Sequence, residues 1–176
     1  FLDNHDVPRI ASSCKGDVGA VRNALRTLMM VRGIPALNYG TEWLMEGERE
    51  PANRGDMRFD GEPPLLADVS ALMDLRARRP SLERGRTEIV GIGDAYIAFL
   101  RILGDETSLV VINEGEETLR LERGQIVGME AKTTAVFGMM NDQQAAQIVV
   151  SPQAVALWDV KGRLAASELD LKQPAS

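Results

Sequence analysis

The chain has 176 residues, of which 44% are hydrophobic and 26% are charged, a composition that is ordinary for a globular protein. Its formal net charge of −6 argues against nucleic acid or an anionic membrane as a partner, because neither attracts an acidic surface. No apolar run approaches the roughly 20 residues that span a bilayer. Cys14 is the only cysteine, so no internal disulfide is possible, and cytoplasmic and secreted locations both stay open.

The first ten residues, FLDNHDVPRI, hold the only histidine in the chain. A short apolar start is followed by the polar run Asn4, His5 and Asp6, and then by Pro8. This order is typical of a buried strand that ends by delivering polar side chains into a cleft. Because the chain starts at Phe1 rather than at Met, we expect it to be part of a longer protein.

Two helical patterns follow in the first 80 residues. Asp17 is a suitable N-cap for a helix that ends near Val31, because apolar residues recur at steps of three and four. The second helix opens at Pro63 and Pro64 and ends at Pro80. The apolar residues of the first helix are Val18, Val21, Leu25, Leu28 and Met29, and those of the second are Leu65, Leu66, Val69, Leu72 and Met73.

Between these helices, Ile34 to Tyr39 is mostly apolar, which predicts a short strand covered on both faces. A long polar stretch from Gly40 to Glu62 follows it. Connections of that length without regular structure are uncommon in compact domains and tend to be functional.

After Pro80 the pattern changes to short β-rich segments that turn signals such as Gly104-Asp105 separate. The chain is therefore predicted to be α/β followed by all-β, with a boundary between Arg79 and Thr87 and domains 1–80 and 81–176. The predicted strands are Thr87 to Ile92, Ala95 to Leu103, Ser108 to Asn113, Thr118 to Glu122, Lys132 to Val136, Gln147 to Val150 and Ala154 to Val160.

An Asn-His-Asp triplet alone most often caps or turns the backbone. Here a second block stands at a suitable distance, RGIPALNYGTEWLMEGEREPANR from Arg32 to Arg54, and a third, LMDLRARRPSLERG, from Leu72 to Gly85. In this order the three blocks resemble the α-amylase superfamily, glycoside hydrolase family 13. The loop EGEREPANRGDMRFD is more similar to cyclomaltodextrinases and neopullulanases than to animal α-amylases.

The resemblance implies the last two β/α units of a (β/α)8 TIM barrel followed by an antiparallel β-sandwich. Retaining glycosidases use a carboxylate nucleophile and a carboxylic acid that protonates the leaving oxygen. In this family both stand on earlier strands, so we expect them upstream of Phe1, and the isolated chain to be inactive without that missing N-terminal part. Asp6 matches the third acidic residue of the family, a transition-state stabiliser that grips two sugar hydroxyls, and His5 matches a histidine that hydrogen-bonds the same sugar.

Three further residues carry an implied binding role. Glu50 and Arg54 match a pair that binds a sugar further from the cleaved bond, with a salt bridge inside the loop as the alternative. Asn4 lies in the substrate-binding cluster, but Ile34 to Tyr39 holds no basic residue that would complete a chloride site, so Asn4 is expected to orient backbone or neighbouring polar groups. The sequence predicts no metal site and no cofactor, since the acidic run at Glu46, Glu48 and Glu50 is typical of a solvated loop.

The resemblance thus implies hydrolysis of α-glucosidic bonds, with an α-glucan or maltooligosaccharide as substrate. Three alternatives stay open. Transglycosylases share these motifs, and some relatives keep the barrel but have lost the catalytic acids and act as interaction proteins. Residues 81–176 could also be a carbohydrate-binding module, which 5% aromatic content and no clear row of aromatic residues make the weakest alternative.

Overall fold

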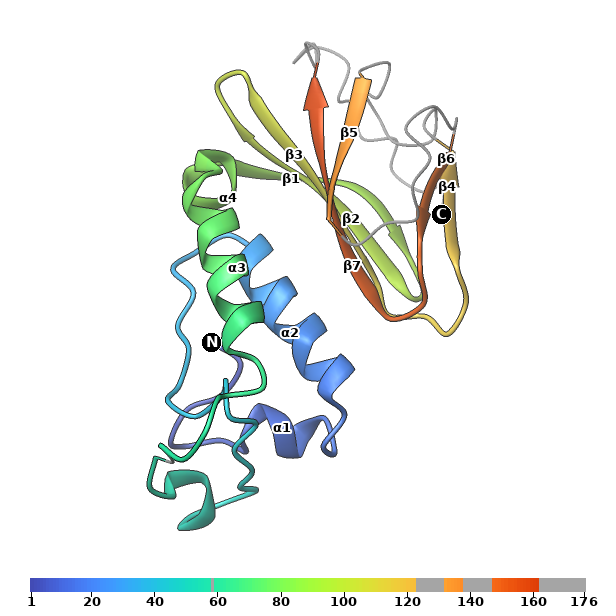
Figure 1. Ribbon diagram of the computed structural model, residues 1–176. Helices are drawn as coiled ribbons and strands as arrows, with labels where there is room; N and C mark the ends of the chain where they lie inside the picture. The colour runs from blue at the N-terminus through green and yellow to red at the C-terminus, as the bar shows by residue number, and fades with distance from the viewer. Residues whose placement is uncertain (58, 123–131, 138–146, 162–176) are drawn as a thin grey trace. The chain divides into compact units, whose positions relative to one another are not determined.

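A computed structural model describes residues 1–57, 59–122, 132–137 and 147–161. The chain divides into two compact units, Phe1–Arg84 and Gly85–Ser176. The division falls between Arg79 and Thr87, where the sequence pattern changes from helical to β-rich. Each unit has its own secondary-structure class (Figure 1).

The first unit is helical. Both long helices expected from the sequence are confirmed, and the Asp17 side chain caps the first by accepting a hydrogen bond of 3.1 Å from the Ala20 N–H. The helices of the unit are α1 Ile10–Ser13, α2 Val18–Met30, the 3-10 turn η1 Ala52–Arg54, α3 Leu66–Ala77 and α4 Pro80–Arg84. The sequence pattern predicted the end of a helix at Pro80. In the structure Pro80 is also the first residue of the short helix α4, a position where its missing N–H costs nothing.

Helices α2 and α3 pack side by side (Figure 1). Their facing stripes bury Val21, Leu25 and Met29 from α2 and Val69 and Leu72 from α3. An ion pair of 3.1 Å between Arg22 Nε and Asp68 Oδ2 also joins the two helices.

The carboxyl end of α2 is held by a buried arginine of α3. The Arg76 guanidinium donates hydrogen bonds to the carbonyls of Met29, Val31 (3.2 Å) and Gly33 (2.6 Å). These are carbonyls at and just beyond the last turn of α2, where the helix itself supplies no donors. Burial lowers the pKa of the Arg76 side chain, and the charge of Glu83 acts in the opposite direction.

The predicted strand at Ile34 to Tyr39 is wrong for this structure. The segment has no strand pairing, and the Ile34 side chain is 95% exposed. The apolar start of the chain likewise forms no strand, and Phe1 is 70% exposed. A parallel strand needs neighbours that take its backbone hydrogen bonds, and the described part of the first unit contains no strand that could pair with either segment.

The described part of the second unit consists of antiparallel strands, as predicted. All seven predicted strands are present, with ends that differ from the prediction by two residues or fewer. They are β1 Arg86–Gly93, β2 Tyr96–Leu103, β3 Glu106–Asn113, β4 Leu119–Glu122, β5 Lys132–Phe137, β6 Gln147–Val150 and β7 Ala154–Lys161. One sheet has the order β1-β2-β3-β7-β5, and β4 pairs with β6 in a second sheet.

The two sheets share one hydrophobic core. Leu100, Leu109 and Trp158 of the larger sheet lie in the same buried cluster as Leu121 and Ile148 of the smaller one. The residues of this core occupy alternate positions, such as Ala98 and Leu100 of β2 and Leu109 and Val111 of β3, as expected of side chains on one face of a strand. Trp158 is therefore a core residue, 5% exposed, and offers no surface for a sugar to stack on.

Candidate functional site

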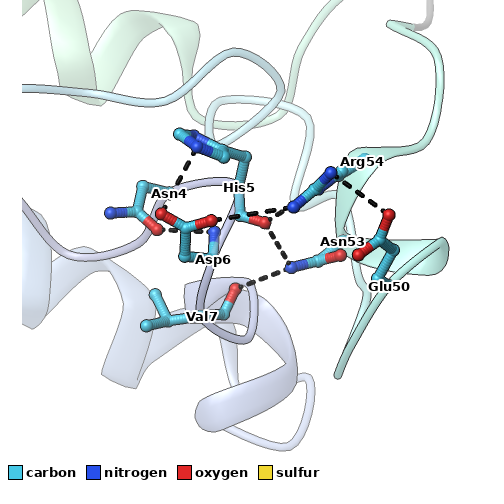
Figure 2. Close-up of polar contacts among 7 residues, drawn as sticks. All are labelled: Asn4, His5, Asp6, Val7, Glu50, Asn53 and Arg54. Atoms are coloured by element: carbon cyan, nitrogen blue, oxygen red, sulfur yellow. Dashed lines mark hydrogen bonds and ion pairs between the residues drawn. The ribbon is translucent and has the colours of Figure 1, made fainter.

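The polar run near the start of the chain forms a tight turn. The Asp6 N–H donates a hydrogen bond of 2.7 Å to Asn4 Oδ1, a local bond that closes the backbone around His5 (Figure 2). Asn4 thus orients backbone, which is one of the roles expected for it from the sequence.

The side chains of His5 and Asp6 both point into solvent from this turn. His5 Nε2 lies 3.3 Å from Asp6 Oδ2, and the two side chains are 67% and 62% exposed. An exposed pair of this kind contributes little to stability. Its polar atoms are accessible to a hydroxyl-bearing ligand, since a carboxylate accepts and an imidazole can donate hydrogen bonds.

The loop after Gly40 brings Glu50 and Arg54 to the same turn (Figure 2). Arg54 Nη1 lies 3.1 Å from Glu50 Oε1, and Arg54 Nη2 lies 3.6 Å from Asp6 Oδ1. Arg54 Nε donates a hydrogen bond of 3.1 Å to the His5 carbonyl, although the two residues are 49 positions apart. The guanidinium therefore joins the two motifs, and the salt bridge inside the loop that the sequence left open is formed.

Asn53 belongs to the cluster, and its role was not predicted from the sequence. Its side-chain amide donates to the carbonyls of His5 (3.0 Å) and Val7 (3.3 Å), and the residue is only 3% exposed. The only sequence signal was its place in the Pro-x-Asn-Arg pattern, which contains no information about its bonding partners.

Backbone contacts fix the loop against the segment that follows the turn. The Arg9 N–H donates to the Gly47 carbonyl at 2.8 Å, and the Gly47 N–H donates to Ser12 Oγ at 2.8 Å. A Cβ atom on Gly47 would lie 2.5 Å from backbone atoms of Ala52 and Asn53, so only glycine allows this approach. Asp3 is 3% exposed and accepts a hydrogen bond of 2.7 Å from the Ile10 N–H, which starts α1.

No group of three His, Cys, Asp or Glu side chains that could hold a metal ion occurs within the described ranges. In the same part of the chain, no helix is long and apolar enough to cross a membrane. The geometry is instead that of an exposed cluster of two carboxylates, one imidazole and one guanidinium, which suits a ligand rich in hydroxyl groups.

No family model matches the chain. Individual proteins do. A cyclomaltodextrin glucanotransferase from Geobacillus stearothermophilus is 33% identical over 151 residues, which cover 84% of this chain and 21% of the relative. An α-amylase from Geobacillus thermoleovorans, solved in complex with acarbose, has a TM-score of 0.77 at 25% identity, covering 93% of this chain and 38% of that structure.

A third protein has a different specificity. Cyclic alpha-maltosyl-(1→6)-maltose hydrolase from Arthrobacter globiformis has a TM-score of 0.73 at 26% identity and covers 92% of this chain and 34% of that structure. The chain belongs to the α-amylase superfamily. It spans between 12% and 24% of the length of eight curated relatives that it matches, so the activity of a whole family member does not follow from membership alone.

Proposed function

We propose that this chain is the C-terminal part of a retaining glycoside hydrolase of the α-amylase superfamily that acts on α-glucans or maltooligosaccharides. One observation carries the proposal. The two motifs on which the family resemblance was based, 49 positions apart at His5 and Arg54, meet in one exposed cluster. If each motif resembled the family only by chance, there would be no reason for the two motifs to lie together in the structure.

Asp6 is the transition-state stabiliser in this proposal, and His5 hydrogen-bonds the same sugar. The transition state of a retaining glycosidase resembles an oxocarbenium ion with a flattened ring. A carboxylate that holds two hydroxyls in the flattened geometry binds the transition state more tightly than the ground state, which raises turnover. The exposure of Asp6 on the turn leaves both of its oxygens accessible to such hydroxyls.

Glu50 and Arg54 bind a sugar further from the cleaved bond. Arg54 has five N–H donors, and the described contacts use one on the His5 carbonyl and direct the two terminal nitrogens toward Glu50 and Asp6. Each terminal nitrogen carries two hydrogens, so about two donors are left for sugar hydroxyls. Asn4 acts at this site through the backbone of the turn.

The nucleophile and the acid that the family chemistry requires come from a preceding part of the same protein. The limited share of each relative that the chain spans supports this arrangement. The exposed apolar side chains of Phe1 and Ile34 also support it, because they would be covered where the first unit completes a (β/α)8 barrel. In that barrel, the segment that begins at Phe1 and the segment that begins at Ile34 occupy the positions of strands. Helices α2 and α3 follow them, and the β unit is the C-terminal domain.

The test compares the full-length protein with the isolated 176-residue chain. The full-length protein is expected to release reducing sugar from maltodextrin and to leave a β-linked glucan intact. The isolated chain is expected to show no turnover, because it lacks the nucleophile and the acid. Measurable maltodextrin turnover by the purified chain would refute the roles proposed for Asp6 and His5, and a full-length protein without activity on any α-glucan would favour an interaction protein.

Transglycosylation is the second candidate function. Several relatives are named cyclomaltodextrin glucanotransferases, and the residues of the cluster suit either reaction because both pass through the same glycosyl transfer. Product analysis separates the two. A hydrolase gives shorter linear sugars with a rise in reducing ends, whereas a transferase gives cyclic or longer products with little rise.

A further inference from the structure

We propose that Asn53 is a positioning residue that sets the geometry of Asp6. It touches no substrate in this proposal and acts through the backbone on both sides of Asp6. The inference rests on the proposed function for the role of Asp6, but its structural part can be measured without any activity.

The contacts of Asn53 surround Asp6 in the sequence. Its amide nitrogen donates to the carbonyl of His5, one residue before Asp6, and to the carbonyl of Val7, one residue after it (Figure 2). Both acceptors are carbonyl oxygens, so only the NH2 group of the amide can face them, and this fixes the orientation of the side chain. Asn53 therefore holds the peptide group that precedes Asp6 and the one that follows Val7, which restrains the backbone on both sides of Asp6.

Burial and backbone contacts fix the position of Asn53 itself. It is 3% exposed, and its backbone N–H donates to the Arg49 carbonyl at 3.1 Å. The Gly47 backbone packs against it, and Gly47 is bonded in turn to Arg9 and Ser12 of the segment that follows the turn. A donor fixed in this way can hold a turn, whereas an exposed side chain such as Arg54, 45% exposed, can move with its ligand.

The position of Asp6 depends on few other contacts. Its side chain is 62% exposed, and its described partners are the exposed residues His5 and Arg54. Burial therefore contributes little to the orientation of the carboxylate, which depends on these two exposed partners and on the backbone of the turn that Asn4 also closes. Misplacing a group at a reacting centre by about 1 Å can lower the rate by a factor on the order of 100.

The decisive variants are Asn53→Ala and Asn53→Asp in the full-length protein. Asn53→Asp keeps the shape but replaces the donor by an acceptor, and Asn53→Ala removes the donor without adding charge. We expect kcat on maltooligosaccharides to fall about 10- to 100-fold in both, with KM changed less than about threefold, because the defect acts at the transition state.

Asn113 provides a matched control. It is also 3% exposed, and its amide also donates to backbone carbonyls, those of Glu117 (2.9 Å), Ser151 (2.9 Å) and Val150 (3.4 Å), all within the second unit. Asn113→Ala and Asn113→Asp are expected to lower the melting temperature and leave kcat unchanged at a temperature where the protein is folded. Asn53 variants that behave in the same way would overturn the inference.

A second measurement uses the 176-residue chain. His5 is its only histidine, so the ring Cε1–H resonance reports on the turn without overlap from another histidine. We expect this resonance to move in Asn53→Ala and Asn53→Asp and to stay in place in both Asn113 variants. An unmoved resonance, or loss of folding in both Asn53 variants while the Asn113 variants fold, would also overturn the inference.

The two proposals can fail separately. If Asp6→Asn leaves turnover intact, the role of Asp6 fails, while the His5 resonance still shows whether Asn53 holds the turn. If Asp6→Asn abolishes turnover and the Asn53 variants match the Asn113 variants, only the positioning role fails.

Discussion

Replacing Arg54 by alanine separates sugar binding from loop support at the candidate site. Losing one charged hydrogen bond to a sugar hydroxyl costs about 1.5–3 kcal/mol, or about a 10- to 150-fold lower kcat/KM on substrates that reach the distant subsite. The contacts of Arg54 with Glu50 (3.1 Å) and Asp6 (3.6 Å) are exposed. Such pairs contribute about 0–1 kcal/mol each to the stability of the loop, and shorter substrates do not reach the distant subsite, so their kcat/KM is expected to stay within a few-fold of the parent. The assay is kcat/KM of both proteins across a series of maltooligosaccharides.

Arg78→Ala is the matched control for this experiment. Arg78 forms an exposed ion pair of 3.1 Å with Asp74 at the same four-residue spacing as Arg54 and Glu50, but it lies at the end of α3. It should leave kcat/KM unchanged at every length. An equal loss on every substrate for Arg54→Ala, with a lower melting temperature than Arg78→Ala, would refute the reasoning, because Arg54 would then support the loop and bind no sugar.

Two further predictions concern stability and the thiol. Arg76→Met should lower the unfolding free energy by about 2–4 kcal/mol, because the buried carbonyls at the end of α2 lose their donor; thermal unfolding that matches Arg78→Met would contradict this. Burial, and secondarily the charge of Asp17, raise the pKa of the Cys14 thiol, so the folded chain has less thiolate than the unfolded chain below that pKa. Cys14 alkylation should therefore be slower in the folded chain than in urea. The rate in urea divided by the rate in the folded chain should decrease as the pH rises from about 8 to about 10. A constant ratio would argue that access alone limits the reaction.

The elements predicted correctly are those whose signal is local. The α2 helix followed from apolar spacing and the Asp17 cap, and the seven strands followed from alternation bounded by turns. The strand at Ile34 to Tyr39 failed because an apolar run does not supply its own hydrogen-bonding partner, and the described first unit holds no strand beside it.

The candidate site was predicted in part, because the sequence motifs are also a local signal. The motifs pointed to His5, Asp6, Glu50 and Arg54, and the structure places these four side chains in one cluster, while their roles stay predictions. Asn53 and Arg76 were missed, because each acts on backbone carbonyls far away in the sequence. Such bonds leave no periodicity and require no particular residue type at the accepting position.

The most direct measurement is the turnover of the full-length protein carrying Asp6→Asn on a maltooligosaccharide. This change keeps the shape of the side chain and removes the charge that is proposed to hold two hydroxyls as the ring flattens. We expect kcat to fall by several orders of magnitude and substrate affinity to change much less, because the lost interaction acts at the transition state. His5→Ala is expected to be milder, since it removes one hydrogen bond to the same sugar. Turnover of Asp6→Asn within a few-fold of the parent would show that Asp6 only shapes the turn and would contradict the central claim.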